Sequence, residues 1–565
     1  MKLSRPKLSL PKVAFKREKS AATSSTRSRA MLVIFCFIGV YAVIFGRLVQ
    51  YGLDELPVAS APGGIDRSLS ARPDITDRNG VVLASDLQVA SLYGDPKKIW
   101  DVDEAVESLA TVFPDMDFAE WHRRLSSGAG FVWLRREVRP SEQAAVMALG
   151  IPGLGFRQET QRFYPQGPVA SHILGLVDID NSGLAGMEKF IDDQGLAMLQ
   201  ELGLTDRETL EPVALSIDSR VQHIVHDELT KAMERFQAIA AGAVVLNAKT
   251  GEVVAMASLP DYDPNNPFNV NEKDRLNRMS GGVFEMGSTF KAFTAAMALD
   301  SGKVGLNDRF DARRPIRIGG FTINDFHGKR RVLSVPEVFI YSSNIGTAKM
   351  ADVVGIEGQR EFLHRLGLLS RMETELPEVA RPTEPKKWKK INSITISFGH
   401  GVSTTPLQTA VAGAALVNGG KLFQPTFLKR GEAEANASAE RVISEETSKE
   451  MRFLFRYNVE GGSGRRSDVE GYFVGGKTGT AEKVVNGRYS GDHRFNAFLS
   501  AFPMDDPEYV VLVIIDEPKP AEGQRSATAG LNAAPMVGNI IRRSATMLGV
   551  EPRYNIGRDL LLAAN

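Results

Sequence analysis

The longest apolar run of the chain lies near its N-terminus, where the seventeen residues from Ala30 to Gly46 carry no charge. The apolar character continues to Leu53, and roughly 20 such residues at about 1.5 Å each make a helix as long as the hydrocarbon core of a bilayer is thick. The pattern therefore predicts a transmembrane helix over residues 30–50. A signal peptide cut near Ala59 or Ala61 is the alternative, but the basic region and the apolar run are both long for one.

Beyond this run, a first region alternates short strand-like and helix-like pieces. It begins with a linker at residues 52–70, which has turn-forming residues and no apolar periodicity. The pattern then predicts strands at Val81–Ala84 and Phe131–Leu134 and helices at Asp103–Val112 and Glu142–Ala148. Because no nucleophile–base arrangement occurs here, we expect residues 51–212 to form a linker and a non-catalytic module of mixed α/β structure, a pedestal of the dimerisation type.

A second region, residues 213–549, has strand patterns at both ends and helical patterns between them. The predicted strands are Ala243–Leu246, Val253–Ala257, Tyr472–Val474, Ala497–Phe502 and Val510–Ile515. The predicted helices include Phe290–Leu299, Val335–Tyr341, Gln359–Leu366 and Pro406–Val417. This order favours an α+β domain in which one antiparallel sheet is assembled from distant segments and is covered by helices.

Length and charge add to this organisation. A chain of 565 residues predicts two or three folded units. Its net charge of +0 argues against nucleic acid as a partner, yet residues 1–29 carry nine Lys and Arg against Glu18 alone, a net charge of +8. The positive-inside rule therefore predicts a cytoplasmic basic tail at 1–29 and folded regions on the outer side of the membrane. Residues 550–565 are expected to form a C-terminal tail.

The first candidate for chemistry is Ser288, followed three residues later by Lys291 at the start of a predicted helix. Residues at this spacing lie on one helix face, with Cβ atoms about 5–6 Å apart, so the lysine can reach the serine hydroxyl. Serine is a weak nucleophile unless a neighbour takes its proton. Lysine can take it only where burial or another cation lowers its pKa from about 10.4. Alone the pattern is weak, since it occurs twice more in the basic tail.

Two further motifs supply the missing groups. Ser342-Ser343-Asn344 offers a hydroxyl, Ser342, to relay a proton from Lys291, and an amide, Asn344, to hold the lysine and a substrate amide. In Lys477-Thr478-Gly479-Thr480, the lysine supplies a cation for a substrate carboxylate and lowers the pKa of Lys291. Thr478 and Thr480 can bind that carboxylate, and Gly479 lets the backbone come close. The N–H groups of Thr480 and Ser288 are candidates for an oxyanion hole.

The three motifs in this order resemble the penicillin-interacting serine enzymes, and the chain resembles the class B penicillin-binding proteins from about Arg72 to Gly549. Further family-like stretches are Asp77-Arg78-Asn79-Gly80, Arg162-Phe163-Tyr164-Pro165, Gly183 to Glu188 and Gly399-His400-Gly401. Gly-Gly-Lys-Thr-Gly-Thr-Ala-Glu at 475–482 is similar to the division-specific (FtsI-type) branch. One departure is Met286, where the family usually has proline.

The resemblance implies a penicillin-binding, serine β-lactamase-like domain with a five-stranded antiparallel sheet. It also implies a D,D-transpeptidase that acts through a Ser288 acyl-enzyme on the D-Ala-D-Ala end of peptidoglycan stem peptides and is inhibited by β-lactams. Catalysis would fall to Ser288, Lys291, Ser342, Asn344 and Lys477, and substrate binding to Thr478, Gly479 and Thr480. It implies no metal or organic cofactor. The expected setting is the bacterial inner membrane, with a periplasmic catalytic domain and, as partners, a polytopic glycosyltransferase and other division proteins.

Other functions stay open at this point. The chain could be an elongation-specific transpeptidase, since the assignment to the septum rests on one short motif. A β-lactamase or carboxypeptidase would use the same serine, and a non-catalytic scaffold or sensor would only bind β-lactams. A Ser-His-Asp hydrolase fits poorly, because Phe290 stands where a nucleophile elbow needs glycine. A metal hydrolase also fits poorly, because the His-Glu-x-x-His motif does not occur.

Overall fold

The computed structural model describes residues 72–196, 210–485 and 487–554, together with positions 39, 41, 557, 561 and 562. The chain divides into two units, residues 1–65 and 66–565, and the account below concerns the second. In the described part of the chain no helix combines the length and apolar character needed to cross a bilayer. The predicted basic tail, the transmembrane helix at 30–50 and the linker at 52–70 lie outside the described residues apart from positions 39 and 41.

The N-terminal module is built on a five-stranded sheet. Long strand β2 pairs antiparallel with both β3 and β4, and the order on the main path is β3-β2-β1-β7. Leu109 on α2, Trp121 on α3 and Phe113, the residue after α2, bury a separate core against these strands. Its elements are β1 (Ile75–Thr76), β2 (Val82–Gly94), α2 (Val102–Val112), α3 (Phe118–Leu125), β3 (Val132–Val138), α4 (Pro140–Leu149), β4 (Leu154–Phe163) and β7 (Val213–Ala214). The mixed α/β structure is confirmed, but the strand predicted at Val81–Ala84 is too short, because β2 continues to Gly94.

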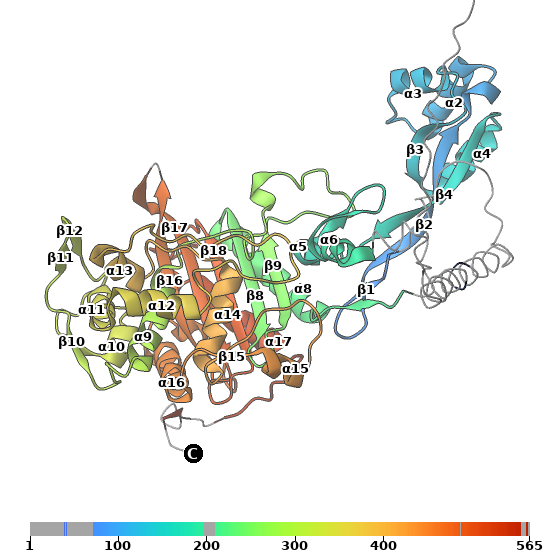
Figure 1. Cartoon of the computed structure of the whole chain (residues 1–565). Coiled ribbons are helices and arrows are strands. Elements are labelled where there is room, and N and C mark those ends of the chain that lie inside the picture. The colour runs from blue at the N-terminus through green and yellow to red at the C-terminus, as the bar shows by residue number, and fades with distance from the viewer. Residues whose placement is uncertain are drawn as a thin grey trace, which may run out of the picture. The chain divides into compact units, whose positions relative to one another are not determined.

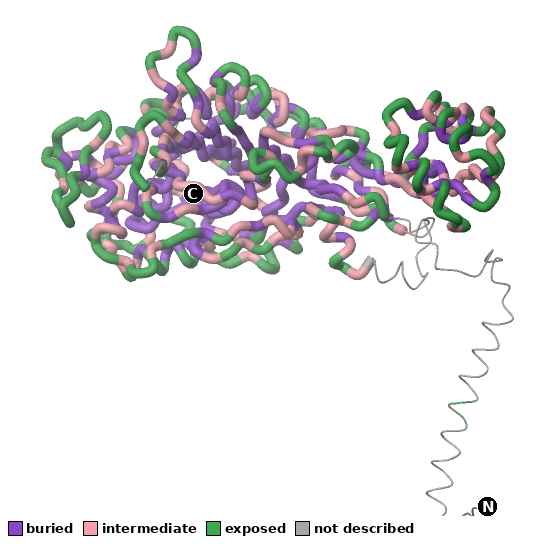
Figure 2. The backbone as a smooth tube through the Cα atoms, turned by 90° about the horizontal axis from the view of Figure 1, so that it is seen from above, coloured by how far each residue is buried: buried purple, intermediate pink, exposed green. Residues whose placement is uncertain are grey.

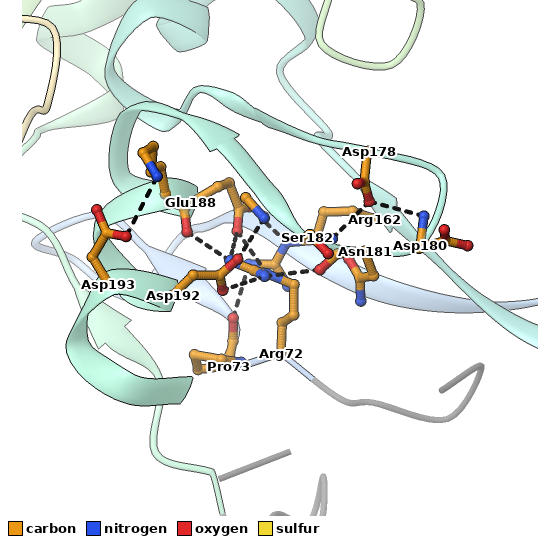
Figure 3. A network of polar contacts seen from close by, with 12 residues as sticks. Arg72, Pro73, Arg162, Asp178, Asp180, Asn181, Ser182, Glu188, Asp192 and Asp193 are labelled. Atoms are coloured by element: carbon orange, nitrogen blue, oxygen red, sulfur yellow. Dashed lines mark hydrogen bonds and ion pairs between the residues drawn. The ribbon is translucent and has the colours of Figure 1, made fainter. Parts of the chain in front are cut away.

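A buried ion-pair network ties the start of this module to its end (Figure 3). Glu188 accepts hydrogen bonds from Arg72 Nε at 2.9 Å and from Arg162 Nε at 2.7 Å. Arg162 also donates to Asp86 at 2.9 Å, and Arg72 to Asp192 at 2.6 Å. The side chains of Glu188, Arg72, Arg162 and Asp86 are fully buried. Here each buried charge has opposite charges as partners, which burial demands.

The residues of this network come from long strands as well as short elements, since Asp86 lies on β2, Arg162 on β4 and Arg72 just before β1. Glu188 lies on α6 (Gly186–Ile191), close to the paired strands β5 (Leu176–Val177) and β6 (Gly183–Ala185) and to α5 (Ser171–Leu174). The same stretch contacts the following domain, because the Gly186 N–H donates to Glu378 at 3.2 Å. A second contact joins Asp77 to Ser219 Oγ at 2.8 Å, at the start of α8 (Ser219–Phe236). The family-like residues noted in the sequence thus hold the module together and attach it to the next domain.

The C-terminal domain is built on a second five-stranded sheet, in the order β16-β17-β18-β8-β9 with every pair antiparallel. Its strands are β8 (Ala240–Asn247), β9 (Val253–Leu259), β16 (Gly475–Val485), β17 (Arg488–Phe502) and β18 (Tyr509–Asp516). The pairing of Val245 with Val511 joins segments far apart in the sequence. Figure 1 shows the green strands β8 and β9 beside the orange-red β17 and β18. The predicted antiparallel sheet from distant segments is confirmed.

Helices cover both faces of this sheet, and the strand residues divide between two cores. Alternate residues of β18 point to opposite faces: Val510, Leu512 and Ile514 enter one core, and Val511, Val513 and Ile515 enter the other. The first core holds α9 (Phe290–Asp300), α14 (Pro406–Val417) and most of α16 (Glu445–Gly461), and the second holds α8 (Ser219–Phe236) and α17 (Ala533–Ser544). Figure 2 shows buried positions gathered in the interior of this domain. The sheet is therefore a rigid layer between two helical layers.

The remaining elements lie mostly between α9 and β16. They are β10 (Arg309–Asp311), β11 (Ile316–Ile318), β12 (Phe321–Ile323), β13 (Val332–Ser334), α10 (Val335–Ile340), α11 (Asn344–Val354), α12 (Ile356–Arg365), α13 (Lys390–Ser397), β14 (Lys421–Leu422), α15 (Glu432–Ser438) and β15 (Glu440–Arg441). The four helices predicted in this domain are confirmed within a few residues at their ends.

One predicted strand is wrong. Tyr472–Val474 is not a strand, and β16 begins only at Gly475. The reason is local: Phe473 has a φ of 41°, in the left-handed region that a strand cannot use. Its carbonyl accepts a hydrogen bond from Met504 N at 2.9 Å, which fixes this turn just before the strand that carries Lys477.

Replacing Glu188 tests the buried network. The change Glu188→Gln leaves two buried guanidinium groups short of a carboxylate, so we expect it to destabilise the N-terminal module by about 3–5 kcal/mol. Urea unfolding followed by hydrogen exchange, resolved by peptide over residues 72–196, measures this loss. The control is Glu107→Gln on the exposed side of α2, which should change stability by less than about 0.5 kcal/mol. Equal protection in both variants would contradict the role given to the network.

Candidate active site

The predicted nucleophile lies in a tight turn that leads into α9. Ser288 is the middle residue of a 3-10 turn, Gly287–Thr289, and α9 begins at Phe290. Thr289 closes the turn by donating both its N–H, at 3.3 Å, and its hydroxyl, at 2.6 Å, to the Met286 carbonyl. The side chain of Ser288 is partly exposed, whereas its neighbours Gly287 and Thr289 are buried. A fixed turn therefore presents one accessible hydroxyl.

The three predicted motifs meet at the hydroxyl of Ser342. Lys291 Nζ donates to the Ser342 carbonyl oxygen at 2.5 Å and to Ser342 Oγ at 3.0 Å. Lys477 Nζ donates to the same Oγ at 3.1 Å and to the Thr478 carbonyl at 3.1 Å. A hydroxyl has two acceptor positions and one donor. With two lysines donating to it, Ser342 keeps its own proton for a third group.

Ser342 holds this position at a cost in backbone conformation. Its φ is 53°, which is uncommon for a residue other than glycine. The turn is held from both sides, since Ser342 N donates to Phe339 O at 3.2 Å and Ser343 N to Val338 O at 3.0 Å, both on α10. Such strain is of order 1–3 kcal/mol and persists only where the surroundings impose it. At Ser342 the strained conformation brings its carbonyl oxygen and its hydroxyl within hydrogen-bond distance of Lys291 Nζ.

The electrostatics of the two lysines favour proton transfer. Burial lowers the pKa of Lys291 well below its usual value, the charge of Lys477 lowers it further, and Asp325 opposes both. Burial also lowers the pKa of Lys477, to about 7. Both side chains are almost fully buried, with 2% and 0% exposure. Two ammonium groups this close disfavour each other, so Lys291 is suited to accept a proton near neutral pH.

The strand β16 passes directly against the nucleophile turn. A Cβ atom on Gly479 would lie 2.3 Å from the Met286 carbonyl oxygen and 2.8 Å from Thr289 Cγ2, so only glycine allows this approach. Because β16 is the end strand of its sheet, the backbone groups on its outer side are not used by β17. The turn and the strand edge thus line a site in which an extended peptide can bind.

The other predicted site residues have structural partners of their own. Thr478 Oγ1 shares a hydrogen bond with Ser463 Oγ, and Thr480 Oγ1 accepts one from Ala529 N at 3.1 Å. Asn344 is the first residue of α11, and its amide donates to the Asn324 carbonyl at 2.9 Å. The contacts of Asn344 with Lys291 and of Ser288 with Lys291, and the substrate contacts of both threonines, stay predictions.

Two carboxylates that the sequence did not single out support the site. Asp325 accepts from Ser343 Oγ at 2.8 Å and from Ile345 N at 3.0 Å, which fixes the start of α11 beside Ser342. Glu285 accepts from Gly401 N at 2.7 Å and from Tyr489 OH at 3.2 Å, and burial raises its pKa. Glu285 stands three residues before Ser288, so its place in the motif was a usable signal. Asp325 lies 17 residues before Ser342, and no local pattern marks it.

The Gly399-His400-Gly401 loop packs behind the nucleophile turn. A Cβ on Gly399 would lie 1.8 Å from the Gly287 carbonyl oxygen, and the φ of Gly399 is 93°, so this position needs glycine. Burial, aided by the charge of Lys291, lowers the pKa of His400 to about 4. The imidazole is therefore neutral at physiological pH, and its ring meets Tyr489 edge to face with centroids 5.2 Å apart. The close approach of Gly399 fixes this loop against the Ser288 turn.

Within residues 72–196, 210–485 and 487–554, no group of three or more His, Cys, Asp or Glu side chains is arranged to hold a metal ion. The geometry places four candidate groups for chemistry in the site: the hydroxyls of Ser288 and Ser342 and the amines of Lys291 and Lys477.

Comparison with known proteins agrees with this geometry. A family model described as the penicillin binding protein transpeptidase domain matches residues 241–542, and one described as the penicillin-binding protein dimerisation domain matches residues 67–194. The chain is 40% identical to the probable peptidoglycan D,D-transpeptidase FtsI of Caulobacter vibrioides, over 96% of this chain and 92% of that protein. It is 33% identical to the probable peptidoglycan D,D-transpeptidase PenA of Neisseria meningitidis serogroup B, over 96% of each. It is 29% identical to the peptidoglycan D,D-transpeptidase FtsI of Escherichia coli, over 93% of this chain and 92% of that protein.

The close approach at Gly479 can be tested by Gly479→Ala. The added methyl group must push β16 away from the nucleophile turn, and a displacement of about 1 Å costs on the order of 100-fold in rate. We expect acylation by a labelled penicillin to slow by about that factor while the melting temperature changes little. Gly431→Ala, at a position with open space, is the matched control and should keep the rate. A Gly479→Ala protein that reacts as fast as the control would contradict the proposed geometry.

Proposed function

Because this chain belongs to the class B penicillin-binding proteins, we propose that it is a peptidoglycan D,D-transpeptidase that cross-links stem peptides through an acyl-enzyme on Ser288. The observation that carries the proposal is the pair of buried lysines that share the Ser342 hydroxyl beside the nucleophile turn. In such a pair, Lys291 can act as a neutral amine that accepts a proton, and Lys477 can act as the cation that binds a substrate carboxylate.

In the first half-reaction, Ser288 Oγ attacks the carbonyl carbon of the penultimate D-Ala while its proton passes to the amine of Lys291. The oxyanion that forms is stabilised by the N–H groups of Ser288 and Thr480, a contribution of about 2.7–4 kcal/mol for one donor. The carbon–nitrogen bond to the last D-Ala then breaks. Lys291 returns the proton to the leaving amine through Ser342, and free D-Ala departs.

In the second half-reaction, a side-chain amine of a neighbouring stem peptide attacks the Ser288 ester. The amine loses a proton by the same Ser342–Lys291 route, and the Ser288 oxygen takes it back when the new amide forms. During the first half-reaction, Lys477, Thr478 and Thr480 hold the terminal carboxylate of the donor peptide, which then leaves with the released D-Ala. A β-lactam carries a carboxylate beside its strained amide, so it acylates Ser288 in the same orientation and inhibits the enzyme.

The setting of the reaction is part of the proposal. The apolar run at residues 30–50 and the basic tail at 1–29 support a single-pass anchor in the inner membrane with the catalytic domain in the periplasm. The domain division at residues 51–212 and 213–549 assigns the first module to docking and the second to catalysis. Relatives named FtsI support a role at the division septum, with a polytopic glycosyltransferase and other division proteins as partners.

A labelled penicillin tests the proposal. We expect the full-length protein to form a covalent adduct that hydrolyses far more slowly than it forms. The Ser288→Ala variant should form no adduct, because only the Ser288 hydroxyl can become the ester. Ser301→Ala, an exposed serine at the end of α9, is the control and should label like the wild type. Labelling retained in Ser288→Ala would contradict the nucleophile, and rapid loss of the label would identify a hydrolase instead.

A further inference from the structure

The segment between α9 and α10 concentrates positive charge beside the candidate active site. Residues 309–331, termed the basic lobe below, carry seven Lys and Arg against two acidic residues, Asp311 and Asp325, while the whole chain has a net charge of +0. Its strands β11 and β12 pair with each other, and β10 pairs with β13, the strand that directly follows the lobe. All seven basic side chains are exposed; they are Arg309, Arg313, Arg314, Arg317, Lys329, Arg330 and Arg331.

Few of these charges are neutralised within the chain. Arg313 pairs with Asp311 and Arg331 with Glu337. The second acidic residue of the lobe, Asp325, is engaged by Ser343 and by the start of α11. No carboxylate among the described residues is within ion-pair distance of Arg314, Arg317 or Arg330. Solvated surface charges are ordinary, but a cluster of one sign on a net-neutral chain raises the local concentration of anions.

Exposed aromatic rings lie among these cations. Phe321 and Phe326 are 65% and 77% exposed. The Lys329 ammonium lies 4.7 Å and the Arg331 guanidinium 5.8 Å from the centre of the Tyr341 ring. Exposed rings in the same segment as a cluster of basic side chains are typical of a binding surface rather than of inert surface.

The basic lobe is attached directly to the catalytic residues. Asn324 and Asp325, next to Phe326, hold the side chains of Asn344 and Ser343. Tyr341, which carries the cation contacts, immediately precedes Ser342. Figure 1 shows β11 and β12 next to α11 and α13, and in the chain the Ser342 turn lies between α10 and α11. A ligand on the lobe would therefore reach the mouth of the site without leaving the surface.

We propose that the basic lobe binds the free side-chain carboxylates of peptidoglycan stem peptides, through Arg314, Arg317 and Arg330, and so guides an uncross-linked strand to Ser288. The proposal rests on the proposed function, which makes a carboxylate-bearing peptide the substrate. The lobe adds a subsite outside the reacting groups. It holds the polymer by charge and ring contacts while Lys477 holds the terminal carboxylate of the peptide.

The test compares two triple variants of the full-length protein in detergent. Arg314→Gln, Arg317→Gln and Arg330→Gln together remove three charges from the lobe. Arg123→Gln, Arg235→Gln and Arg542→Gln together remove three exposed charges elsewhere and serve as the control. The readouts are KM and kcat for D-Ala release from uncross-linked peptidoglycan strands, and the acylation rate with a labelled penicillin. A second strand preparation has its side-chain carboxylates amidated and its terminal D-Ala carboxylate left free.

We expect the lobe variant to raise KM for the carboxylate strands about tenfold, because exposed charges at the rim of a site each contribute modestly to binding, and to leave kcat unchanged. Its penicillin acylation should match the control, since the small inhibitor does not reach the lobe. With amidated strands, the lobe variant and the wild type should have the same KM.

Three results would overturn the proposal: an unchanged KM in the lobe variant, an equal rise in the control, or the same rise with amidated strands. Reduced binding to vesicles that contain anionic phospholipid, with KM unchanged, would assign the lobe to lipid headgroups instead. Failure of the transpeptidase assignment itself is distinguishable, because the wild type would then form no lasting penicillin adduct.

Discussion

The chemistry of this protein depends on keeping the amine of Lys291 without its proton at neutral pH. Burial supplies most of that effect, and Lys477 adds to it through the shared hydroxyl of Ser342. A buried lysine without a carboxylate partner is costly for a fold. It is tolerated here because both ammonium groups donate to fixed carbonyl and hydroxyl oxygens and need not be charged at the same time.

The fold serves this constraint by bringing three distant segments to one place. The antiparallel sheet positions β16 at its edge, Gly479 lets that edge touch the Ser288 turn, and the strained Ser342 turn reaches the two lysines from α10. The sheet and its two helical cores make this arrangement rigid. Hydrogen bonds to Glu285 and Asp325 then fix the loops that carry the remaining side chains.

Much of this could be predicted from the sequence, for physical reasons. The uninterrupted apolar run Val510–Ile515 and the helical pattern of Pro406–Val417 reflect burial, which sequence records directly. The motifs around Ser288, Ser342 and Lys477 predicted the residues that the structure brings together. The residues of Tyr472–Val474 favour a strand by composition. The left-handed turn at Phe473 is imposed by tertiary contacts instead, so the composition is misleading there. Asp325 and the hydrogen bond between Thr478 and Ser463 depend on distant segments, so no local pattern revealed them.

The pH dependence of penicillin acylation tests the neutral-amine account most directly. In the free enzyme, the second-order rate constant should fall on the acid side as Lys291 becomes protonated, at a pH well below the usual lysine value of about 10.4. Lys477→Gln removes one cause of the low pKa, so its acid limb should lie at higher pH, whereas Lys477→Arg keeps a cation and should keep the limb low. A wild-type rate that rises only near the ordinary lysine range, or a limb that does not move in Lys477→Gln, would contradict the account.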